Sequence, residues 1–153
     1  MLGASEPGPV VVVLGAAATQ IQARVAFSGA LVVVAEDWEE GQAASLRAGV
    51  AALPGVSAVV VTLGDQPFIT AAAIDAVVGG RREGCDAVRA TYAGTPGHPV
   101  LLGSAVMERV GELRGDVGAR ELLHGVGVCE VECGELGDPT DIDTPETLQE
   151  VQA

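Results

Sequence analysis

Lysine is absent from this sequence, and aromatic residues are scarce. The 153 residues carry 21 acidic residues against eight arginines, which gives a net charge of −13. A chain this acidic is repelled by polyanions, so we expect neither nucleic acid nor an anionic membrane as a partner. Aromatic residues make up 3% and hydrophobic residues 48% of the chain. Ala, Val and Leu must therefore build the core, and this apolar content is typical of a globular protein rather than a disordered one.

Long hydrophobic runs are also lacking. None approaches the roughly 18 residues that a membrane-spanning helix needs, which excludes an integral membrane protein. The first nine residues hold no basic stretch followed by an apolar one, so a secretory signal is not expected. The three cysteines are Cys85, Cys129 and Cys133. An odd number in such a chain does not favour a disulfide framework, and the cytoplasm is the expected location.

In the first half of the chain, strand-like segments alternate with helical ones. Continuous runs of mainly β-branched residues predict buried strands at Pro9–Leu14, Leu31–Val34 and Val56–Leu63. Helical spacing of apolar residues predicts helices at Ala17–Ala26 and Gly41–Leu53. This order is typical of the α/β class, with a doubly wound, mostly parallel, Rossmann-like sheet covered by helices on both faces.

The second half is less regular. Alternating apolar residues predict strands at Asp86–Tyr92 and, at a sheet edge, Val126–Cys133, and glycine and proline predict a loop at Tyr92–Gly97. No internal repeat or linker interrupts the pattern, so residues 1–153 are expected to form a single domain. Further helices are predicted at Thr70–Val78, Ser104–Leu113 and Asp116–His124 and after Thr144.

Asp65 is the first candidate for chemistry. It follows the third predicted strand, within Gly64-Asp65-Gln66-Pro67, and ligands of a doubly wound sheet bind beyond the carboxyl ends of its strands. A carboxylate there, beside a glycine that permits close approach, suits Mg²⁺, which prefers one or two carboxylates together with waters and phosphate oxygens. The alternative is that Asp65 only opens a turn or caps the next helix.

A second acidic candidate lies near the C-terminus. In an extended Asp141-Ile142-Asp143 segment both carboxylates face one side. They would repel each other unless a cation lies between them. The alternative is a solvated Asp141 and a helix cap at Asp143 or Thr144. Considered together, Asp65 and Asp143 would complete a metal site for phosphoryl or nucleotidyl transfer.

Two further residues have both a functional and an ordinary interpretation. His98, in Gly97-His98-Pro99, is either a ligand contact or a common surface histidine. Arg120 lies in the first turn of a predicted helix, where a cation opposes the helix dipole, and this position indicates an anionic partner.

Six short segments follow one another in a specific order and spacing from about Pro9 to the C-terminus. They are Asp37–Gly41, Ser45–Gly49, Leu63–Pro67, Gly97–Pro99, Gly115–Arg120 and Asp141–Glu146. Taken together, these segments resemble the molybdenum cofactor cytidylyltransferase branch of the MobA-like nucleotidyltransferases.

The resemblance implies an enzyme that joins CMP from CTP, or the nucleotide of another NTP, to the phosphate of a molybdopterin cofactor and releases pyrophosphate. Asp65 and Asp143 would then be the catalytic residues and would hold Mg²⁺. The segment Gly97–Pro99 would line the acceptor side of the cleft. The other binding residues that the resemblance implies are Gly64, Gln66 and Pro67, beside Gly97, His98 and Pro99.

One family feature is missing. The family opens with a strand, the signature Leu-Ala-Ala-Gly-x-Ser-x-Arg-Met-Gly and a nearby lysine, which Leu14–Ala18 echoes only in part. The first strand, loop and helix are therefore expected to be absent, as in an N-terminally shortened member. Three alternatives stay open: the cytidylyltransferase itself, a related guanylyl- or sugar-phosphate nucleotidyltransferase, or a non-catalytic accessory domain that docks on a molybdoenzyme.

Overall fold

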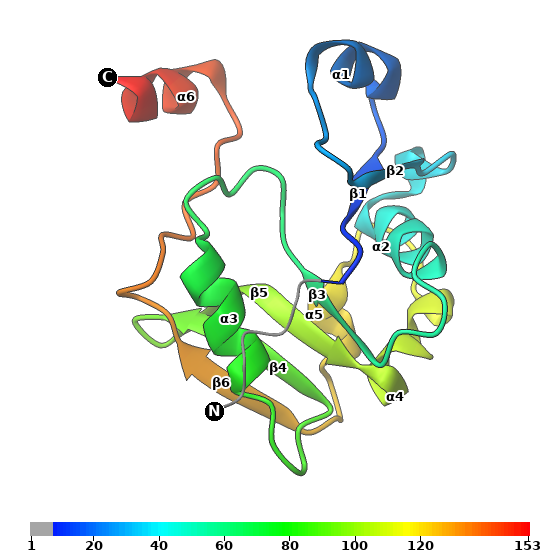
Figure 1. Cartoon of the computed structure of the whole chain (residues 1–153), viewed down its shortest axis with the longest axis vertical. Coiled ribbons are helices and arrows are strands. Elements are labelled where there is room, and N and C mark those ends of the chain that lie inside the picture. Colours follow the sequence, from blue (N-terminus) through cyan, green and yellow to red (C-terminus); the bar gives the residue numbers. More distant parts are fainter. Residues whose placement is uncertain (1–7) are drawn as a thin grey trace. The chain divides into compact units, whose positions relative to one another are not determined.

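The computed structural model describes residues 8–153, which divide into two compact units (Figure 1). The first unit takes in the described residues up to Ser57 together with Ser104–Gly125, and the second takes in Ala58–Gly103 and Val126–Ala153. No helix in the described part is long and apolar enough to cross a membrane. The expectation about a secretory signal rests largely on residues 1–7, which lie outside the described residues.

The first unit is built on two short parallel strands. β1 (Val11–Leu14) pairs with β2 (Leu31–Val34), and α1 (Ala18–Arg24) connects them, as the sequence predicts. α2 contacts both strands and buries the small side chains of Ala43 and Ala44, which allow close approach. The other helices of this unit are η1 (Trp38–Glu40), α2 (Gln42–Ala51), α4 (Ser104–Met107), η2 (Val110–Glu112) and α5 (Ala119–Leu122).

The second unit is a four-stranded sheet in the order β3–β5–β4–β6. β5 is antiparallel to both of its neighbours, whereas β4 and β6 are parallel to each other. The α/β class is confirmed, and β6 lies at the sheet edge as predicted. The elements of this unit are β3 (Ala58–Val61), α3 (Ala71–Gly79), β4 (Ala87–Tyr92), β5 (Thr95–Gly103), β6 (Val128–Glu132) and α6 (Pro145–Gln152).

The core of the second unit lies between α3 and the sheet. Thr70 caps α3 as predicted, because its hydroxyl accepts a hydrogen bond of 3.2 Å from the N–H of Ala73. Ala73 and Val77 lie one turn apart and are fully buried, in a cluster that includes Val88 of β4 and Leu101 of β5. Full burial of a valine or leucine side chain contributes about 1.5–3 kcal/mol, so this cluster fixes α3 on the sheet.

β4 and β5 form a hairpin where the sequence predicted a loop. Only Ala93 and Gly94 make the turn, and Thr95 already belongs to β5. Both turn residues have positive φ angles, 50° and 80°, as a tight two-residue hairpin turn requires. The loop prediction for Tyr92–Gly97 was wrong, because Pro96 and Gly97 lie within β5 and pair with β4, although proline and glycine are typical of loops.

A bulge accommodates the second proline of β5. Arg89 lies opposite Val100 and Ala90 lies opposite Gly97, so His98 and Pro99 have no partner residue in β4. A bulge is a position where a strand tolerates proline, because the ladder needs no N–H there. His98 therefore lies within β5 and not next to a loop.

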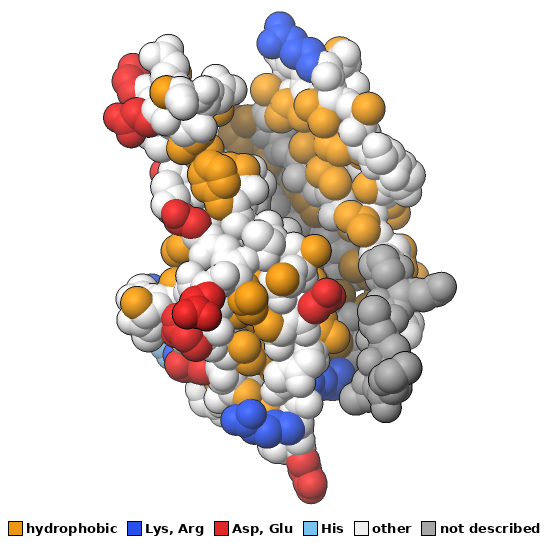
Figure 2. All heavy atoms as spheres, turned by 60° about the vertical axis from the view of Figure 1, so that its left-hand side comes forward, with side chains coloured by type: hydrophobic (Ala, Val, Ile, Leu, Met, Phe, Trp, Pro, Cys, Tyr) orange, Lys and Arg blue, Asp and Glu red, His pale blue; other side chains and the backbone are white. Residues whose placement is uncertain are grey.

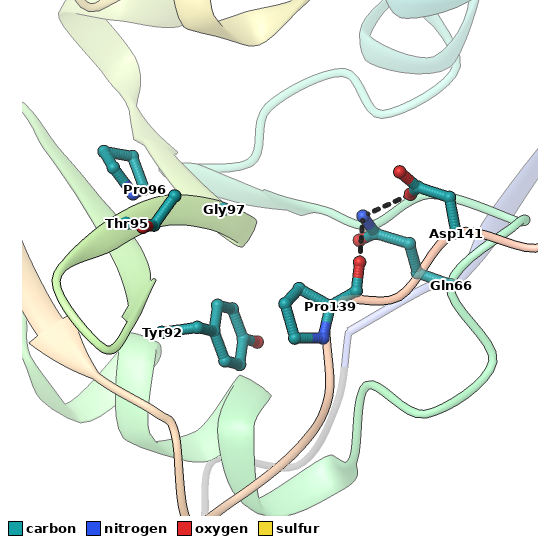
Figure 3. Close-up of a pocket in the computed structure, with 7 residues that line it drawn as sticks. All are labelled: Gln66, Tyr92, Thr95, Pro96, Gly97, Pro139 and Asp141. Atoms are coloured by element: carbon teal, nitrogen blue, oxygen red, sulfur yellow. Dashed lines mark hydrogen bonds between the residues drawn. The ribbon is translucent and has the colours of Figure 1, made fainter.

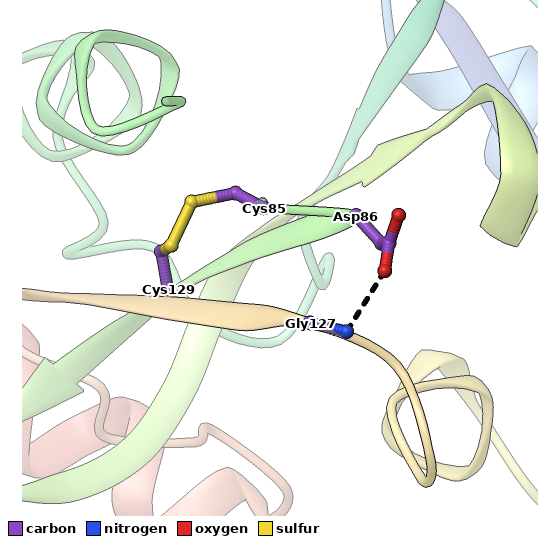
Figure 4. The surroundings of a disulfide bond; sticks show 4 residues. All are labelled: Cys85, Asp86, Gly127 and Cys129. Atoms are coloured by element: carbon purple, nitrogen blue, oxygen red, sulfur yellow. Dashed lines mark hydrogen bonds between the residues drawn. A yellow bond between two sulfur atoms is a disulfide. The ribbon is translucent and has the colours of Figure 1, made fainter. Parts of the chain in front are cut away.

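A disulfide joins Cys85 and Cys129, contrary to the sequence expectation (Figure 4). Cys129 is part of β6, and the parallel pairing of β4 with β6 brings it to Cys85, which lies just before β4; their Cα atoms are 5.6 Å apart. Beside the disulfide, the N–H of Gly127 donates to Oδ2 of Asp86 at 2.8 Å. Cys133 is a buried free thiol, and burial raises its pKa. The odd number of cysteines did not exclude a disulfide, because Cys85 and Cys129 pair and Cys133 stays in the core as a free thiol.

Some large hydrophobic side chains are exposed on both units, and Figure 2 shows such side chains at the surface. Neither α1 nor α6 buries a residue, so neither helix contributes to a core. The exposed large hydrophobic residues are Val10, Val25, Leu31 and Trp38 in the first unit and Phe68, Leu148 and Val151 in the second.

Candidate functional site

The loop after β3 and the segment before α6 lie against each other in the second unit. The N–H of Ile142 donates to the carbonyl oxygen of Asp65 at 2.7 Å, and the N–H of Asp138 donates to that of Phe68 at 3.2 Å. These backbone hydrogen bonds hold together the two acidic segments that the sequence singled out. Asp65 itself lies in a turn, as the ordinary interpretation of this residue also predicted.

Gln66 ties these two segments together through its side chain (Figure 3). Its Nε2 donates to Oδ1 of Asp141 at 2.7 Å and to the carbonyl oxygen of Pro139 at 3.2 Å. Because both partners are acceptors, the amide can take only one orientation. Oε1 is then buried with no hydrogen-bond partner among the described residues. Gln66 therefore holds Asp141 beside the Asp65 loop.

A pocket of about 430 Å³ opens beside Gln66, within the size range of small-ligand sites. One side comes from the β4–β5 hairpin and the other from the Asp65 loop and the C-terminal segment (Figure 3). A Cβ on Gly97 would come within 3.1 Å of the Tyr92 ring, so only glycine fits there without displacing that ring. The lining residues are Gln66, Tyr92, Thr95, Pro96, Gly97, Pro139 and Asp141.

The charge of the pocket wall is negative. Asp141 is the one charged side chain among the lining residues in the described part of the chain. An anionic ligand such as a phosphate would be repelled by this wall unless a cation accompanied it. From the sequence, Asp141 was one of two neighbouring acidic residues. Neither Asp141 nor Tyr92 nor Pro139 was predicted as a site residue.

His98 lies close enough to both acidic segments for their negative charges to affect its pKa. It is partly buried, and burial lowers its pKa, while the negative charges of Asp65 and Asp141 partly offset that effect. The hydroxyl of Tyr92 donates to the carbonyl oxygen of His98 at 2.6 Å and holds the bulge. His98, Asp65 and Asp141 thus belong to one neighbourhood, which the sequence order alone did not establish.

Asp143 is exposed and lies two residues beyond Asp141. The cap of α6 is Thr144, whose hydroxyl accepts from the N–H of Thr147 at 3.1 Å. Asp143 is therefore not needed as the helix cap, which leaves its carboxylate available.

Three other predicted residues are accessible. A Cβ on Gly64 would meet no described atom within 4 Å, so a ligand could approach the backbone there. Pro67 is exposed. Arg120 is exposed on α5 and makes no ion pair among the described residues, so its anionic partner stays a prediction.

The described residues contain no group of three or more His, Cys, Asp or Glu side chains arranged to hold a metal ion. Asp65 and Asp143 supply carboxylate oxygens, the ligand type that Mg²⁺ and Mn²⁺ prefer. Mg²⁺ in particular is often held by only one or two carboxylates, with water and substrate phosphate completing its shell. The donor type of Asp65 and Asp143 therefore fits a metal ion that binds together with a phosphate substrate, and their joint role as ligands stays a prediction.

In the first unit, Arg47 and Glu40 together connect three of the segments that carried the resemblance. Its guanidinium donates to Asp37 at 2.7 Å, to Glu40 at 2.6 Å and to the carbonyl oxygen of Leu113 at 2.6 Å. Glu40 also accepts from the N–H of Gly115 at 3.1 Å. The bonds to Arg47 and to this amide lower the pKa of Glu40. The spacing of these segments therefore reflects a network of hydrogen bonds within the first unit.

Comparison with known proteins decides the family. The sequence matches the MobA-like NTP transferase domain over residues 1–131. The chain belongs to the MobA-like NTP transferase family. The resemblance read from the sequence is thereby confirmed at the level of the family.

Two curated MobA-like relatives have different names. Nicotine blue oxidoreductase of Paenarthrobacter nicotinovorans is 29% identical over 148 residues, which cover 91% of this chain and 72% of that protein. The purine catabolism protein PucB of Bacillus subtilis (strain 168) is 34% identical over 125 residues, which cover 78% of this chain and 60% of PucB. The aligned region is thus less than two thirds of PucB.

Solved structures of this family share the fold. The homologue of Mycobacterium tuberculosis Rv0371c from Mycobacterium sp. strain JC1 matches with a TM-score of 0.81 and 30% identity, over 94% of this chain and 73% of that one. Rv0371c in complex with manganese, from M. tuberculosis H37Rv, matches with a TM-score of 0.77 and 28% identity, over 94% and 76% of the two chains.

Proposed function

We propose that this protein is a metal-dependent nucleotidyltransferase of the cofactor-cytidylyltransferase type, with CTP as donor and a molybdopterin phosphate as acceptor. The observation that carries the proposal is the attachment of the acidic C-terminal segment to the Asp65 loop by Gln66 and by the backbone of Ile142. This attachment places two acidic segments beside a pocket that a phosphate could enter only with a cation. The manganese complex of Rv0371c supports the use of a divalent metal in this family.

The proposed reaction forms a bond between an oxygen of the acceptor phosphate and the α-phosphorus of CTP. The bond from that phosphorus to the bridging oxygen of the β-phosphate breaks, and pyrophosphate leaves with the electron pair. A bound Mg²⁺ supplies charge neutralisation for the phosphates. Asp65 and Asp143 would hold it, Gly64 and Pro67 would border the nucleotide, and the bulge Gly97–Pro99 would orient the acceptor.

Nucleotide-linked stabilisation is the direct test. We expect CTP with Mg²⁺ or Mn²⁺ to raise the melting temperature of the full chain, since a ligand at about 100 times its Kd stabilises the folded state by about 2.7 kcal/mol. Asp65→Asn and Asp143→Asn should each lose this shift. Asp75→Asn is the matched control, because Asp75 is an exposed acid on α3, outside the pocket lining.

The donor nucleotide is tested separately. GTP, ATP and CTP are compared in the same thermal assay and in release of pyrophosphate with a molybdopterin or sugar-phosphate acceptor. A larger effect of GTP would favour a guanylyltransferase over the cytidylyl proposal. Absence of any nucleotide-linked shift with either metal would refute the proposed function.

A non-catalytic binding domain is the second candidate. It is favoured by the absence of lysine and of the Arg-Met-Gly signature, because family members use that segment around the nucleotide phosphates. Such a domain would show a nucleotide shift or binding to a molybdoenzyme without release of pyrophosphate. Turnover by the 153-residue chain would exclude it.

A cytoplasmic location is part of the proposal, because nucleoside triphosphates are cytoplasmic substrates. Disulfides are rare in that compartment. The state of Cys85 and Cys129 in cells treated with a thiol-blocking reagent before lysis therefore tests the location. A disulfide that is already formed in the cells when the thiols are blocked would contradict this location, whereas one that forms only after lysis would not.

A further inference from the structure

Glu132 is the last residue of β6, and its carboxylate fills the inside of the β4–β5 turn. Oε1 accepts from the N–H of Ala93 at 2.7 Å and from that of Gly134 at 3.2 Å. Oε2 accepts from the hydroxyl of Thr91 at 2.7 Å and from the N–H of Gly94 at 3.2 Å. One side chain therefore satisfies four donors, two of which belong to the turn.

These contacts are unusual for an exposed side chain. Hydrogen bonds from Thr91 and from the backbone of Ala93 and Gly94 lower the pKa of Glu132, so its carboxylate is charged at neutral pH. Charged acceptors make stronger hydrogen bonds than neutral ones. A turn with two positive φ angles has its N–H groups directed away from the strand ladder, and the carboxylate gives them a partner.

The same hairpin forms one side of the pocket. Tyr92, Thr95, Pro96 and Gly97 line it, and all four lie within three residues of the turn. The Tyr92 hydroxyl then fixes the bulge through the carbonyl oxygen of His98. A displacement of the turn would therefore move the pocket wall.

We infer that Glu132 is a positioning residue that sets the hairpin wall of the pocket, although it does not line the pocket itself. Glu132 thereby controls binding of the phosphate acceptor rather than of the nucleotide. This link to the acceptor rests on the proposed function.

Glu130 provides a matched control on the same strand. It lies two residues before Glu132, so both side chains are on the same face of β6. Glu130 accepts from Arg89 at 2.6 Å and has no hydrogen bond to the turn. Glu130→Gln therefore removes a comparable charge and weakens only the ion pair with Arg89, while the contacts of Glu132 with the turn stay intact.

Amide hydrogen exchange tests the positioning role without any turnover. In Glu132→Ala we expect the amides of Ala93 and Gly94 to exchange about tenfold faster, because each loses its acceptor. Glu132→Gln should show an intermediate increase, since it keeps one acceptor oxygen, and it decides the test if the alanine variant does not fold. Amides of α3 should stay unchanged in Glu132→Gln, and Glu130→Gln should match the wild type at the turn.

Tyr92 gives a second signal, because it is the only tyrosine of the chain. With ¹³C-labelled tyrosine, the single ring signal should shift in Glu132→Gln and not in Glu130→Gln. Unchanged turn amides and an unchanged Tyr92 signal in Glu132→Gln would overturn the inference.

Kinetics then test the link to the acceptor. With molybdopterin and CTP, Glu132→Gln should raise KM for molybdopterin and leave KM for CTP unchanged. Equal changes in both constants would overturn the assignment to the acceptor side. If the wild-type chain shows no turnover, the proposed function fails, while amide exchange and the Tyr92 signal still decide the positioning role.

Discussion

Nε2 of Gln66 donates a hydrogen bond of 2.7 Å to Oδ1 of Asp141, a residue 75 positions further along the chain. The same nitrogen also donates to the carbonyl oxygen of Pro139, so both of its N–H groups have an acceptor. A side chain without a hydrogen-bond donor at its end could satisfy neither acceptor. The C-terminal acidic segment therefore depends on a single residue of the Asp65 loop for its side-chain attachment.

Gln66→Glu should weaken this attachment. The new carboxylate would face Asp141 and a carbonyl oxygen, so two hydrogen bonds are lost and a like-charge contact appears. We expect the free energy of unfolding to fall by about 1–3 kcal/mol in urea denaturation at pH 7. Gln149→Glu, on the exposed surface of α6, makes the same change at a side chain that has no hydrogen-bond partner among the described residues.

Asp141→Asn separates the hydrogen bond from the charge. An asparagine keeps an oxygen that can accept from Gln66, so stability should stay within about 0.5 kcal/mol of the wild type. A loss as large as that of Gln66→Glu would show that the charge of Asp141, and not its bond to Gln66, stabilises the segment.

His98 should titrate below the usual histidine range in the metal-free protein. Burial lowers its pKa, and Asp65 and Asp141 act in the opposite direction. Removal of either carboxylate, by Asp65→Asn or Asp141→Asn, should lower the pKa of His98 further. The chain has only two histidines, so the imidazole signals in proton NMR can be assigned with His124→Asn.

The same shift predicts how stability depends on pH. The unfolded chain binds a proton at His98 near its ordinary pKa of 6.5, while the folded chain does so only at lower pH. Stability should therefore decrease as pH falls from about 6.5 towards the folded pKa, and this part of the slope should disappear in His98→Gln. An unchanged slope in that variant would contradict the assignment.

Loss of the disulfide should destabilise the second unit. Cys85 and Cys129 are 44 residues apart, and a cross-link over such a span contributes about 2–4 kcal/mol. Cys85→Ser and Cys129→Ser should each lower the urea midpoint, and a reducing agent should lower it in the wild type. In denaturant without reductant, a thiol reagent should modify one cysteine, and after reduction three. Three reactive thiols without reductant would show that the disulfide does not form.

Local patterns predicted the elements whose own sequence determines them. The runs of β-branched residues predicted β1, β2 and β3, and Thr70 and Thr144 were predicted near helix starts that they indeed cap. β5 was missed because its two prolines and its glycines are tolerated only through pairing with β3 and β4 and through the bulge at His98 and Pro99. Such tertiary pairing leaves no local pattern in the sequence.

Only part of the site was predicted, because the rest of it also depends on tertiary contacts. Asp65 and the segment of Asp141 and Asp143 were selected by their charge and their place after predicted elements. The hydrogen bond of Gln66 to Asp141 and the contacts of Glu132 with the turn join residues 38 or more positions apart, which spacing does not reveal. The roles of Asp65 and Asp143 in metal binding stay predictions.

The chain passes between the two units three times, after Ser57, after Gly103 and after Gly125. The disulfide between Cys85 and Cys129 closes the last two passages into one covalent ring. A single proteolytic cut anywhere between these cysteines, including within Ser104–Gly125, therefore leaves all 153 residues in one molecule until the disulfide is reduced. Only the passage after Ser57 lies outside the ring, and a cut there releases a separate fragment once the protein is denatured.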